Sequence, residues 1–201
     1  MLSSGRSSVA KAGLIILWVG AAALAGLGVA TSGIYFGLYN VAADEPHSQS
    51  VYRLLQTIRD RSIAVRATAI DVPADLSDSE RIGSGGGQYA EMCSSCHLAP
   101  GMERTEISRG LYPRAPELRR GSRATPAEDF WVVKHGIKAT GMPAWGVTHS
   151  DKLLWDIVAF VRRLPELSSD EYKEIINRAP RSHDEIMEEM KTNGSQNNHA
   201  H

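Results

Sequence analysis

A long uncharged stretch near the N-terminus dominates the hydrophobic pattern of the chain. Residues 14–39 read LIILWVGAAALAGLGVATSGIYFGLY and contain no charged side chain. A helix that crosses a bilayer needs about 20 such residues, whereas the apolar part of a cleaved signal peptide has about 7–15. The length therefore predicts a transmembrane anchor over residues 14–39. Small residues at 41–43 leave a cleaved signal peptide as the alternative.

Charged side chains on either side of this stretch predict its orientation. Arg6 and Lys11 precede it, and Asp44 and Glu45 follow it. Positively charged residues favour the cytoplasmic side of a membrane. We therefore expect residues 1–13 to be cytoplasmic and the remainder of the chain to lie beyond the membrane.

Beyond the anchor, apolar positions recur at helical spacing, which predicts an all-α protein. In residues 40–78, which we interpret as a linker, Val51, Leu54, Leu55 and Ile58 share one face of a helix. The arginines of this segment lie either against lipid headgroups or in solvent.

Capping signals predict where the helices of the next segment, residues 79–164, begin. The first helix starts near Ser77 or Asp78. Later starts are Thr125 with Pro126 and Glu128, Thr148 with Asp151, Ser168 with Glu171, and Ser182 with Glu185. The last two lie in residues 165–201, which we interpret as a charged helical extension with a disordered tail.

Three consecutive glycines, Gly85, Gly86 and Gly87, fall within the first of these helices. Each costs about 1 kcal/mol relative to alanine in a helix interior. Glycine also lets two helix backbones approach closely. The stretch therefore indicates either a close helix crossing or a flexible break before a shorter helix.

Composition and charge add little to this picture. The chain has 22 Lys and Arg against 23 Asp and Glu, a formal net charge of −1. This balance points to no particular partner and gives no reason to expect nucleic-acid binding.

The cysteines change the picture, because the chain has two and both lie in Cys93-Ser94-Ser95-Cys96-His97. C-x-x-C-H is typical of covalent c-type haem attachment, with thioethers to both cysteines and the histidine as an axial iron ligand. A structural zinc site needs four ligands, and a thioredoxin-like dithiol needs a βαβ context. A disulfide between Cys93 and Cys96 would close a small, strained loop. We therefore predict one covalently bound haem c.

The second axial ligand is predicted to be Met142, in the sequence Gly-Met-Pro 45 residues after His97. A thioether is soft and stabilises Fe(II), so His/Met ligation suits an electron carrier. The less favoured candidates are Met92, Met102, Met187, Met190, His135 and His149.

At this point the chain resembles a class I c-type cytochrome over residues 79–164. Gly85 and Tyr89, eight and four residues before the first cysteine, resemble the glycine and aromatic residue of the family's N-terminal helix. Ile157 and Phe160 resemble the partner positions on its C-terminal helix. The resemblance implies the class I cytochrome c fold, here with an N-terminal transmembrane helix and a short helical extension.

The resemblance also implies further contacts of the haem. Pro100 in CHLAPG resembles the proline whose carbonyl accepts the N–H of the proximal histidine, a bond that orients the imidazole. We expect haem-pocket walls from five side chains, Trp145, Trp131, Tyr112, Leu111 and Ile137.

Four longer segments narrow the resemblance. They are similar to bacterial membrane-anchored single-haem cytochromes, which are often labelled as like subunit III of cbb3-type oxidases. The segments are CSSCHLAPG, GLYPRAPEL, DFWVVKHGIKATGMPAWG and DIVAFVRRLPELSSDEY. That oxidase subunit usually carries two CxxCH motifs, whereas this chain carries one. The similarity implies a single-pass protein of the bacterial inner membrane with its haem domain in the periplasm.

We expect the chain to be an electron-transfer protein rather than an enzyme. It would serve a respiratory or dehydrogenase-linked chain, with a membrane redox complex or a periplasmic dehydrogenase or oxidase as partner. A peroxidase-like haem enzyme and a structural or sensor subunit are the alternatives. Arginines between 104 and 123, with Lys134 and Lys138, would steer an acidic partner, pair with a haem propionate or simply be solvated.

Overall fold

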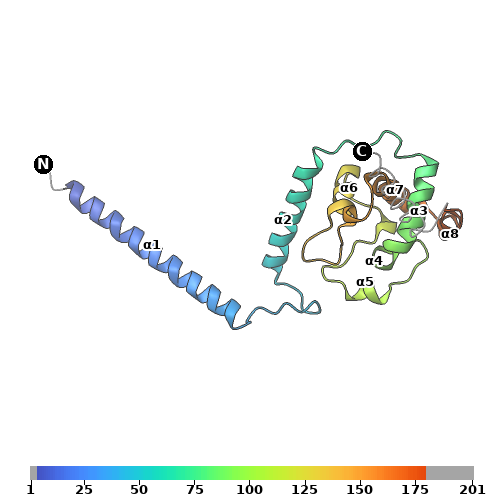
Figure 1. Cartoon of the computed structure of the whole chain (residues 1–201). Helices are drawn as coiled ribbons and strands as arrows, with labels where there is room; N and C mark the ends of the chain where they lie inside the picture. The colour runs from blue at the N-terminus through green and yellow to red at the C-terminus, as the bar shows by residue number, and fades with distance from the viewer. Residues whose placement is uncertain (1–3, 180–201) are drawn as a thin grey trace, which may run out of the picture. The chain divides into compact units, whose positions relative to one another are not determined.

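The computed structural model describes residues 4–179 and contains helices and loops without a β-strand in that range. The predicted all-α class is thereby confirmed. The chain divides between Glu45 and Pro46 into two compact units, which are described separately. The first contains α1 (Ser4–Tyr35). The second contains α2 (Gln49–Ala67), α3 (Ser79–Met92), α4 (Ser94–His97), α5 (Glu106–Gly110), α6 (Pro126–His135), α7 (Asp151–Arg163) and α8 (Ser169–Asn177), with the short 3₁₀ turns η1 (Leu118–Arg120), η2 (Trp145–Val147) and η3 (Leu164–Glu166) (Figure 1).

Helix α1 is long and apolar enough over Lys11–Tyr35 to cross a membrane. This is a criterion of length and composition, and an N-terminal signal sequence also meets it. The helix ends at Tyr35 rather than at residue 39, because Gly37 adopts a left-handed φ of 65°. The amide of Leu38 then donates to the carbonyl of Gly33 at 2.9 Å, a bond that closes the helix end.

The predicted helix starts in the second unit are mostly those observed. The Asp78 carboxylate accepts the amide of Glu80 at 2.8 Å and caps α3. Thr125 and Glu128 form the expected capping box of α6, with Pro126 as the first helical residue. These starts depend on four consecutive residues at most, which is why they can be predicted from sequence.

The start of α7 differs from the prediction. Ser150 caps this helix, two residues beyond the expected Thr148, which instead ends the turn η2. In α8 the predicted capping box of Ser168 and Glu171 is confirmed. The box expected at residues 182–185 lies outside the described residues.

A close crossing of α3 and α7 forms the centre of the unit. Helix α3 runs without interruption through its glycines, so the crossing is observed and the break is not. A Cβ atom at Gly85 would lie 1.9 Å from the carbonyl oxygen of Asp156. Four residues after Gly85, the ring of Tyr89 packs against Phe160 with centroids 5.3 Å apart, and both side chains are fully buried. The glycine and aromatic pair implied by the resemblance therefore lies where α3 meets α7.

The Asp156 carboxylate is an ion-pair partner buried at this crossing, with 1 % of its side chain exposed. It accepts hydrogen bonds from Arg81 at 2.7 Å and from Ser84 at 3.1 Å, both on α3. Arg81 also bonds Asp75, just before α3, and this bond lowers the pKa of Asp75. A buried carboxylate needs such partners, so the set fixes the two helices in one register.

Helix α8, from the predicted extension, packs against α3 (Figure 1). Leu167 and Tyr172 belong to the same buried cluster as the α3–α7 contact. A Cβ atom at Gly86 would lie 2.7 Å from a methyl group of Ile175. The second glycine of α3 thus makes room for α8.

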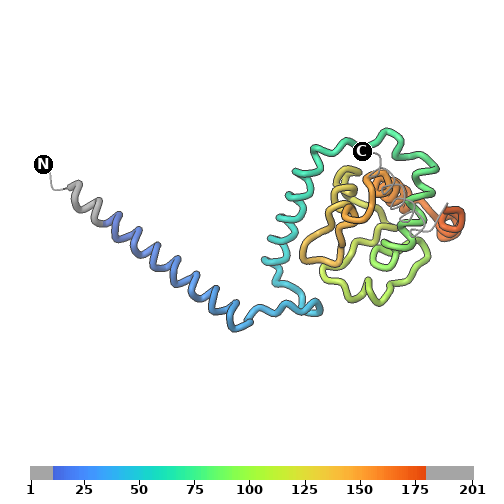
Figure 2. The backbone as a smooth tube through the Cα atoms, in the orientation of Figure 1, coloured from blue at the N-terminus to red at the C-terminus, as the bar shows by residue number. Residues whose placement is uncertain are grey.

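On the other side of the unit, α2 lies beside α6 (Figure 1). Between α5 and α6 the chain follows an extended irregular path (Figure 2). This path and the loop after α6 hold the candidate site.

Candidate haem-binding site

The two cysteines lie where α3 ends and the single helical turn of α4 begins. Cys93 is buried and ends α3, whereas Cys96 is half-buried in α4, and the two are not joined by a disulfide. Burial, with a smaller contribution from the charge of Cys96, raises the pKa of Cys93 to about 12. This environment disfavours a thiolate and suits a neutral thioether.

The zinc alternative receives no support from the surroundings of the cysteines. Among residues 4–179, no group of three or more His, Cys, Asp or Glu side chains is placed to hold a metal ion. A structural zinc site would require four such ligands.

His97 is held by one hydrogen bond to the backbone. Its Nδ1 atom lies 2.9 Å from the carbonyl oxygen of Pro116. A carbonyl oxygen can only accept, so this contact requires the proton on Nδ1 and leaves the lone pair of Nε2 for a metal. Burial lowers the pKa of His97, which keeps the imidazole neutral.

The acceptor of this bond was expected to be Pro100, and that assignment is wrong for this contact. Leu98 and Gly101 both adopt left-handed φ angles, of 61° and 78°. The amide of Met102 bonds the carbonyl of Ala99 at 3.0 Å, which closes a tight turn around Pro100. This turn packs against α8, because a Cβ atom at Gly101 would lie 2.5 Å from Ser169 Oγ.

Met142 lies in a tightly bonded loop between α6 and η2. The amide of Met142 donates to Thr140 Oγ1 at 3.1 Å, and the amide of Ile137 donates to the Met142 carbonyl at 3.2 Å. The loop begins at Gly136, which has a φ of 64° and where a Cβ atom would lie 2.7 Å from the Met142 oxygen. Gly136 therefore allows the backbone of this loop to pack closely on itself.

A side-chain contact joins this loop to the segment that carries Pro116, the hydrogen-bond acceptor of His97. A Cβ atom at Gly141 would lie 2.4 Å from Cδ2 of Leu111. Leu111 precedes Pro116 on the irregular path after α5, so Met142 and the acceptor of His97 belong to segments that touch. The role of Pro116 could not be predicted from the sequence, because only the path of this loop brings it to the histidine.

The competing ligands are placed in other roles. Nδ1 of His149, which is buried, lies 2.8 Å from Thr148 Oγ1 and 3.2 Å from the Trp145 carbonyl oxygen, as expected of a capping histidine. His135 is exposed, its ring lies 5.0 Å from that of Trp131 with a tilt of 38°, and it lines the cavity next to α2. Met92 and Met102 pack against the buried cluster of the crossing. Met187 and Met190 lie outside the described residues.

Of the expected pocket walls, Trp145 is half-buried against the same cluster, with its ring 5.5 Å from His149. Tyr112, Trp131 and Ile137 line a cavity next to α2. Leu111 touches Gly141 instead. Contact of any of these side chains with a haem stays a prediction.

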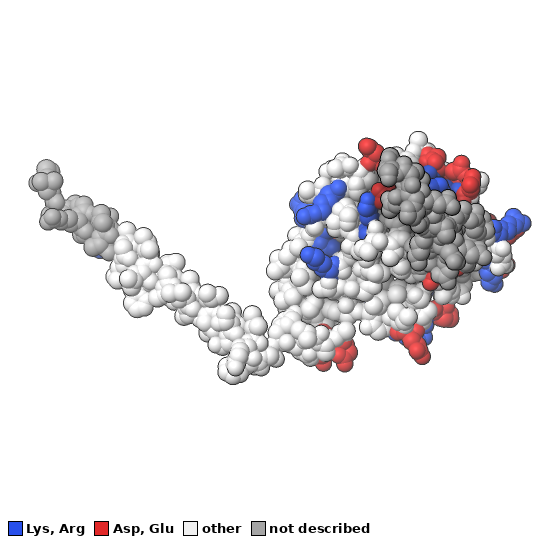
Figure 3. All heavy atoms as spheres, in the orientation of Figure 1, with Lys and Arg blue, Asp and Glu red and all other residues white. Residues whose placement is uncertain are grey.

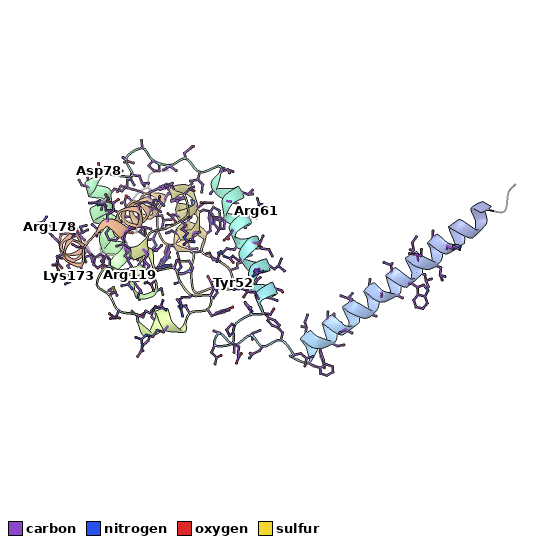
Figure 4. All side chains as sticks on the ribbon, turned by 180° about the vertical axis from the view of Figure 1, so that it is seen from behind. Tyr52, Arg61, Asp78, Arg119, Lys173 and Arg178 are labelled. Atoms are coloured by element: carbon purple, nitrogen blue, oxygen red, sulfur yellow. The ribbon has the colours of Figure 1, made fainter. Side chains whose placement is uncertain are left out.

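Three arginines of the basic loop after the cysteines share one carboxylate. Glu117 accepts from Arg104 at 2.7 Å and from Arg119 at 3.2 Å, and it pairs with Arg120 at 3.0 Å. The bonds from Arg104 and Arg119 lower the pKa of Glu117. Arg119 also donates to the carbonyl of Met102. In Figure 4 Arg119 lies away from α2, which carries Tyr52 and Arg61.

These residues fit a covalent haem c. The thiols are unpaired, the imidazole presents Nε2, and the methionine lies on a loop with a fixed backbone. Cys93, Cys96, His97 and Met142 would hold the cofactor, and Pro116 would orient the imidazole.

Comparison with known proteins supports this assignment. The sequence model of the family described as "Cytochrome C oxidase, cbb3-type, subunit III" matches residues 80–161, which comprise almost all of the segment from α3 to α7. No curated protein matches the chain. The family suggests a membrane redox complex as partner. Residues 80–161 therefore form a cytochrome c-type domain similar to that of subunit III of cbb3-type oxidase, a domain that implies haem c and haem-based electron transfer.

Proposed function

We propose that this chain is a membrane-anchored monohaem cytochrome c that transfers single electrons in a periplasmic respiratory or dehydrogenase-linked chain. The observation that carries this proposal is the bond between His97 Nδ1 and the Pro116 carbonyl, directly after two unpaired cysteines. The bond prepares Nε2 for an iron atom, and the cysteines offer the two sulfur atoms that thioethers need.

Each of the four residues has a distinct task. Cys93 and Cys96 would supply the two sulfur atoms for thioether attachment of the haem, and His97 would supply one ligand of its iron. Met142 would supply the other, a soft thioether that favours the reduced state. Haem c supplies the one-electron iron couple, while the protein sets its potential and access.

The proposal makes the chain an electron carrier and not an enzyme. A peroxidase-like activity needs an open iron position, whereas Met142 would fill it. The backbone bonds at Ile137 and Thr140 support this, because they restrict how far the loop can move. The sensor or structural alternative has no such specific support.

The location follows from α1 and the cysteines together. A single apolar helix at the N-terminus would anchor the chain in the bacterial inner membrane, and haem attachment would place the second unit in the periplasm. Its redox partner would then be a membrane redox complex or a periplasmic dehydrogenase or oxidase.

Covalent attachment provides the test of this proposal. The full-length protein is produced in a host that matures c-type cytochromes and is stained for haem after a denaturing gel. We expect one haem-positive band, which weakens in Cys93→Ser and Cys96→Ser and disappears in the double variant. Ser95→Ala, between the cysteines, is the control and should stain normally. A full-length protein that carries no haem after denaturation would overturn the proposal.

A further inference from the structure

A cavity of about 610 Å³ lies between α2 and the loops next to α6. Its walls on the α2 side include Tyr52, Leu55, Ile63, Arg59 and Arg66. Helix α2 precedes the matched family segment at 80–161, so the cavity depends on a part of the chain outside that segment.

The charges around this cavity are all of one sign. Three of its lining residues, Arg59, Arg66 and Lys138, are cationic, and no Asp or Glu is among the described residues that line it. The whole chain is nearly neutral, so the excess of positive charge at this cavity is a local feature. Figure 3 shows Lys and Arg side chains gathered where α2 lies. An apolar cavity with a cationic rim suits a flat apolar group that carries carboxylates.

Within residues 4–179, Arg59 and Arg66 have only weak partners. Arg59 bonds the neighbouring Asp60 at 2.8 Å, and the side chain of Asp60 is 56 % exposed. Exposed ion pairs of this kind contribute little to stability. Arg66 donates to the backbone carbonyl and hydroxyl of Ser62. Both guanidinium groups can therefore exchange these contacts for a carboxylate inside the cavity.

The position of the cavity relates it to the candidate haem site. Tyr112 and Pro113 line it, and they lead to Pro116, the partner of His97. Ile137 and Thr140 line it as well, and both bond the backbone of Met142. The cavity thus lies between the segments that supply the two axial sides, and neither cysteine lines it.

Haem carries its two vinyl groups and its two propionates on opposite edges. The cysteines fix the vinyl edge, so the propionate edge must lie away from Cys93 and Cys96. We infer that the cavity beside α2 receives the propionate edge of the haem, and that Arg59 and Arg66 bind the two carboxylates. This inference rests on the proposed function. It also means that α2 closes the haem site. The arginines paired with Glu117 are not free to bind the propionates.

The test compares variants of the full-length haem-loaded protein in detergent. In the double variant Arg59→Gln/Arg66→Gln, loss of two positive charges beside the haem should lower the midpoint potential, because a cation stabilises the reduced iron. The corresponding double lysine variant should recover most of the shift. Arg61→Gln is the matched control, since Arg61 lies on the same helix but does not line the cavity. Its potential should equal that of the wild type.

A free carboxylate amphiphile, such as a fatty acid, has the same chemistry and is the competing occupant. Native mass spectrometry of the wild type, of Arg59→Gln/Arg66→Gln and of Arg61→Gln distinguishes a fatty acid from the haem propionates as the occupant. We expect the mass of the chain plus one haem in each case. A fatty acid bound to the wild type and lost from the double variant, with an unchanged potential, would overturn the inference.

Failure of this inference differs from failure of the proposed function. If haem is covalently bound but the double variant and Arg61→Gln have the same potential, the assignment of the propionate edge is wrong. If the wild type carries no covalent haem, the proposed function is wrong and this inference falls with it.

Discussion

The hydroxyl of Tyr89 donates a hydrogen bond of 2.6 Å to the carbonyl oxygen of Leu98. Tyr89 is fully buried on α3, and Leu98 directly follows His97. Leu98 adopts a φ of 61°, a conformation that glycine accepts and that is uncommon for leucine. The bond and the burial of the leucine side chain therefore hold the backbone in a strained turn right after the proximal histidine.

Replacement of Tyr89 by Phe should destabilise the second unit by about 1–3 kcal/mol, because the Leu98 carbonyl would be buried without a partner. The free energy of unfolding, measured by denaturant titration of the full-length protein in detergent, checks this. Tyr52→Phe is the control, since within residues 4–179 no hydrogen bond of the Tyr52 hydroxyl is present; it should change stability by less than about 0.5 kcal/mol. Equal effects of the two substitutions would contradict the role assigned to Tyr89.

The crossing of α3 and α7 predicts opposite effects at two glycines of the same helix. Gly85→Ala should destabilise by about 3 kcal/mol or more, since its methyl group would overlap the Asp156 carbonyl. Gly83 has nothing within 4 Å of the corresponding position, so Gly83→Ala should stabilise α3 by about 0.5–1 kcal/mol. Thermal unfolding followed by circular dichroism distinguishes them. A mild effect of Gly85→Ala would mean that α3 and α7 lie farther apart than the structure shows.

Helix α8 is expected to stabilise the domain although it lies beyond the matched segment. Tyr172 on α8 is buried with its ring 6.1 Å from that of Phe160 on α7, and burial raises its pKa to about 12. Tyr172→Ala should destabilise by about 3–5 kcal/mol, as expected for loss of a buried aromatic ring. Lys173→Ala, at the next and exposed position, should have almost no effect. A comparison of denaturation midpoints tests this pair, and a neutral Tyr172→Ala would make α8 an accessory element.

Local signals predicted the helix starts at Asp78, Thr125 and Ser168, because a cap depends on adjacent residues. The crossing at Gly85 was also predicted, through the resemblance of the glycine and aromatic spacing. The acceptor of His97 was assigned to the nearby Pro100, whereas the structure brings Pro116 from 19 residues away. Such a contact depends on the path of a long loop, which has no sequence period.

For a related reason, the cavity beside α2 could not be predicted from the sequence. The helical pattern of Leu55 and Ile58 indicates an apolar face but does not say what covers it. In the same way, the pattern of the basic loop does not indicate that Glu117 pairs with three of its arginines. Partner choice among distant residues is decided by tertiary packing.

Glu117 should make stability depend on pH in the acid range. Its folded-state pKa lies below the ordinary value of 4.5, mainly through Arg104 and then Arg119. The ionised carboxylate therefore stabilises the fold fully above 4.5, and this stabilisation is lost as the pH falls through the folded-state pKa. Glu117→Gln should be less stable than wild type near neutral pH, and the difference should shrink in acid.

Unfolding midpoints measured from about pH 7 to about pH 3 check this prediction. Glu103→Gln is the control, since Glu103 is exposed and makes no ion pair within the described range. A gap between wild type and Glu117→Gln that stays constant with pH would show that the carboxylate acts by packing rather than by charge.

The most direct test of the account is the absorption spectrum and midpoint potential of the full-length haem protein beside those of Met142→Leu. Leucine keeps the volume of methionine but removes the sulfur ligand. The account predicts that the oxidised wild type shows the weak long-wavelength Fe–S band, and that the variant loses this band, has a lower potential and binds carbon monoxide when reduced. Met92→Leu should leave all three properties unchanged. A wild type without the band, or a Met142→Leu variant with the wild-type spectrum and potential, would contradict His/Met ligation and with it the proposed electron carrier.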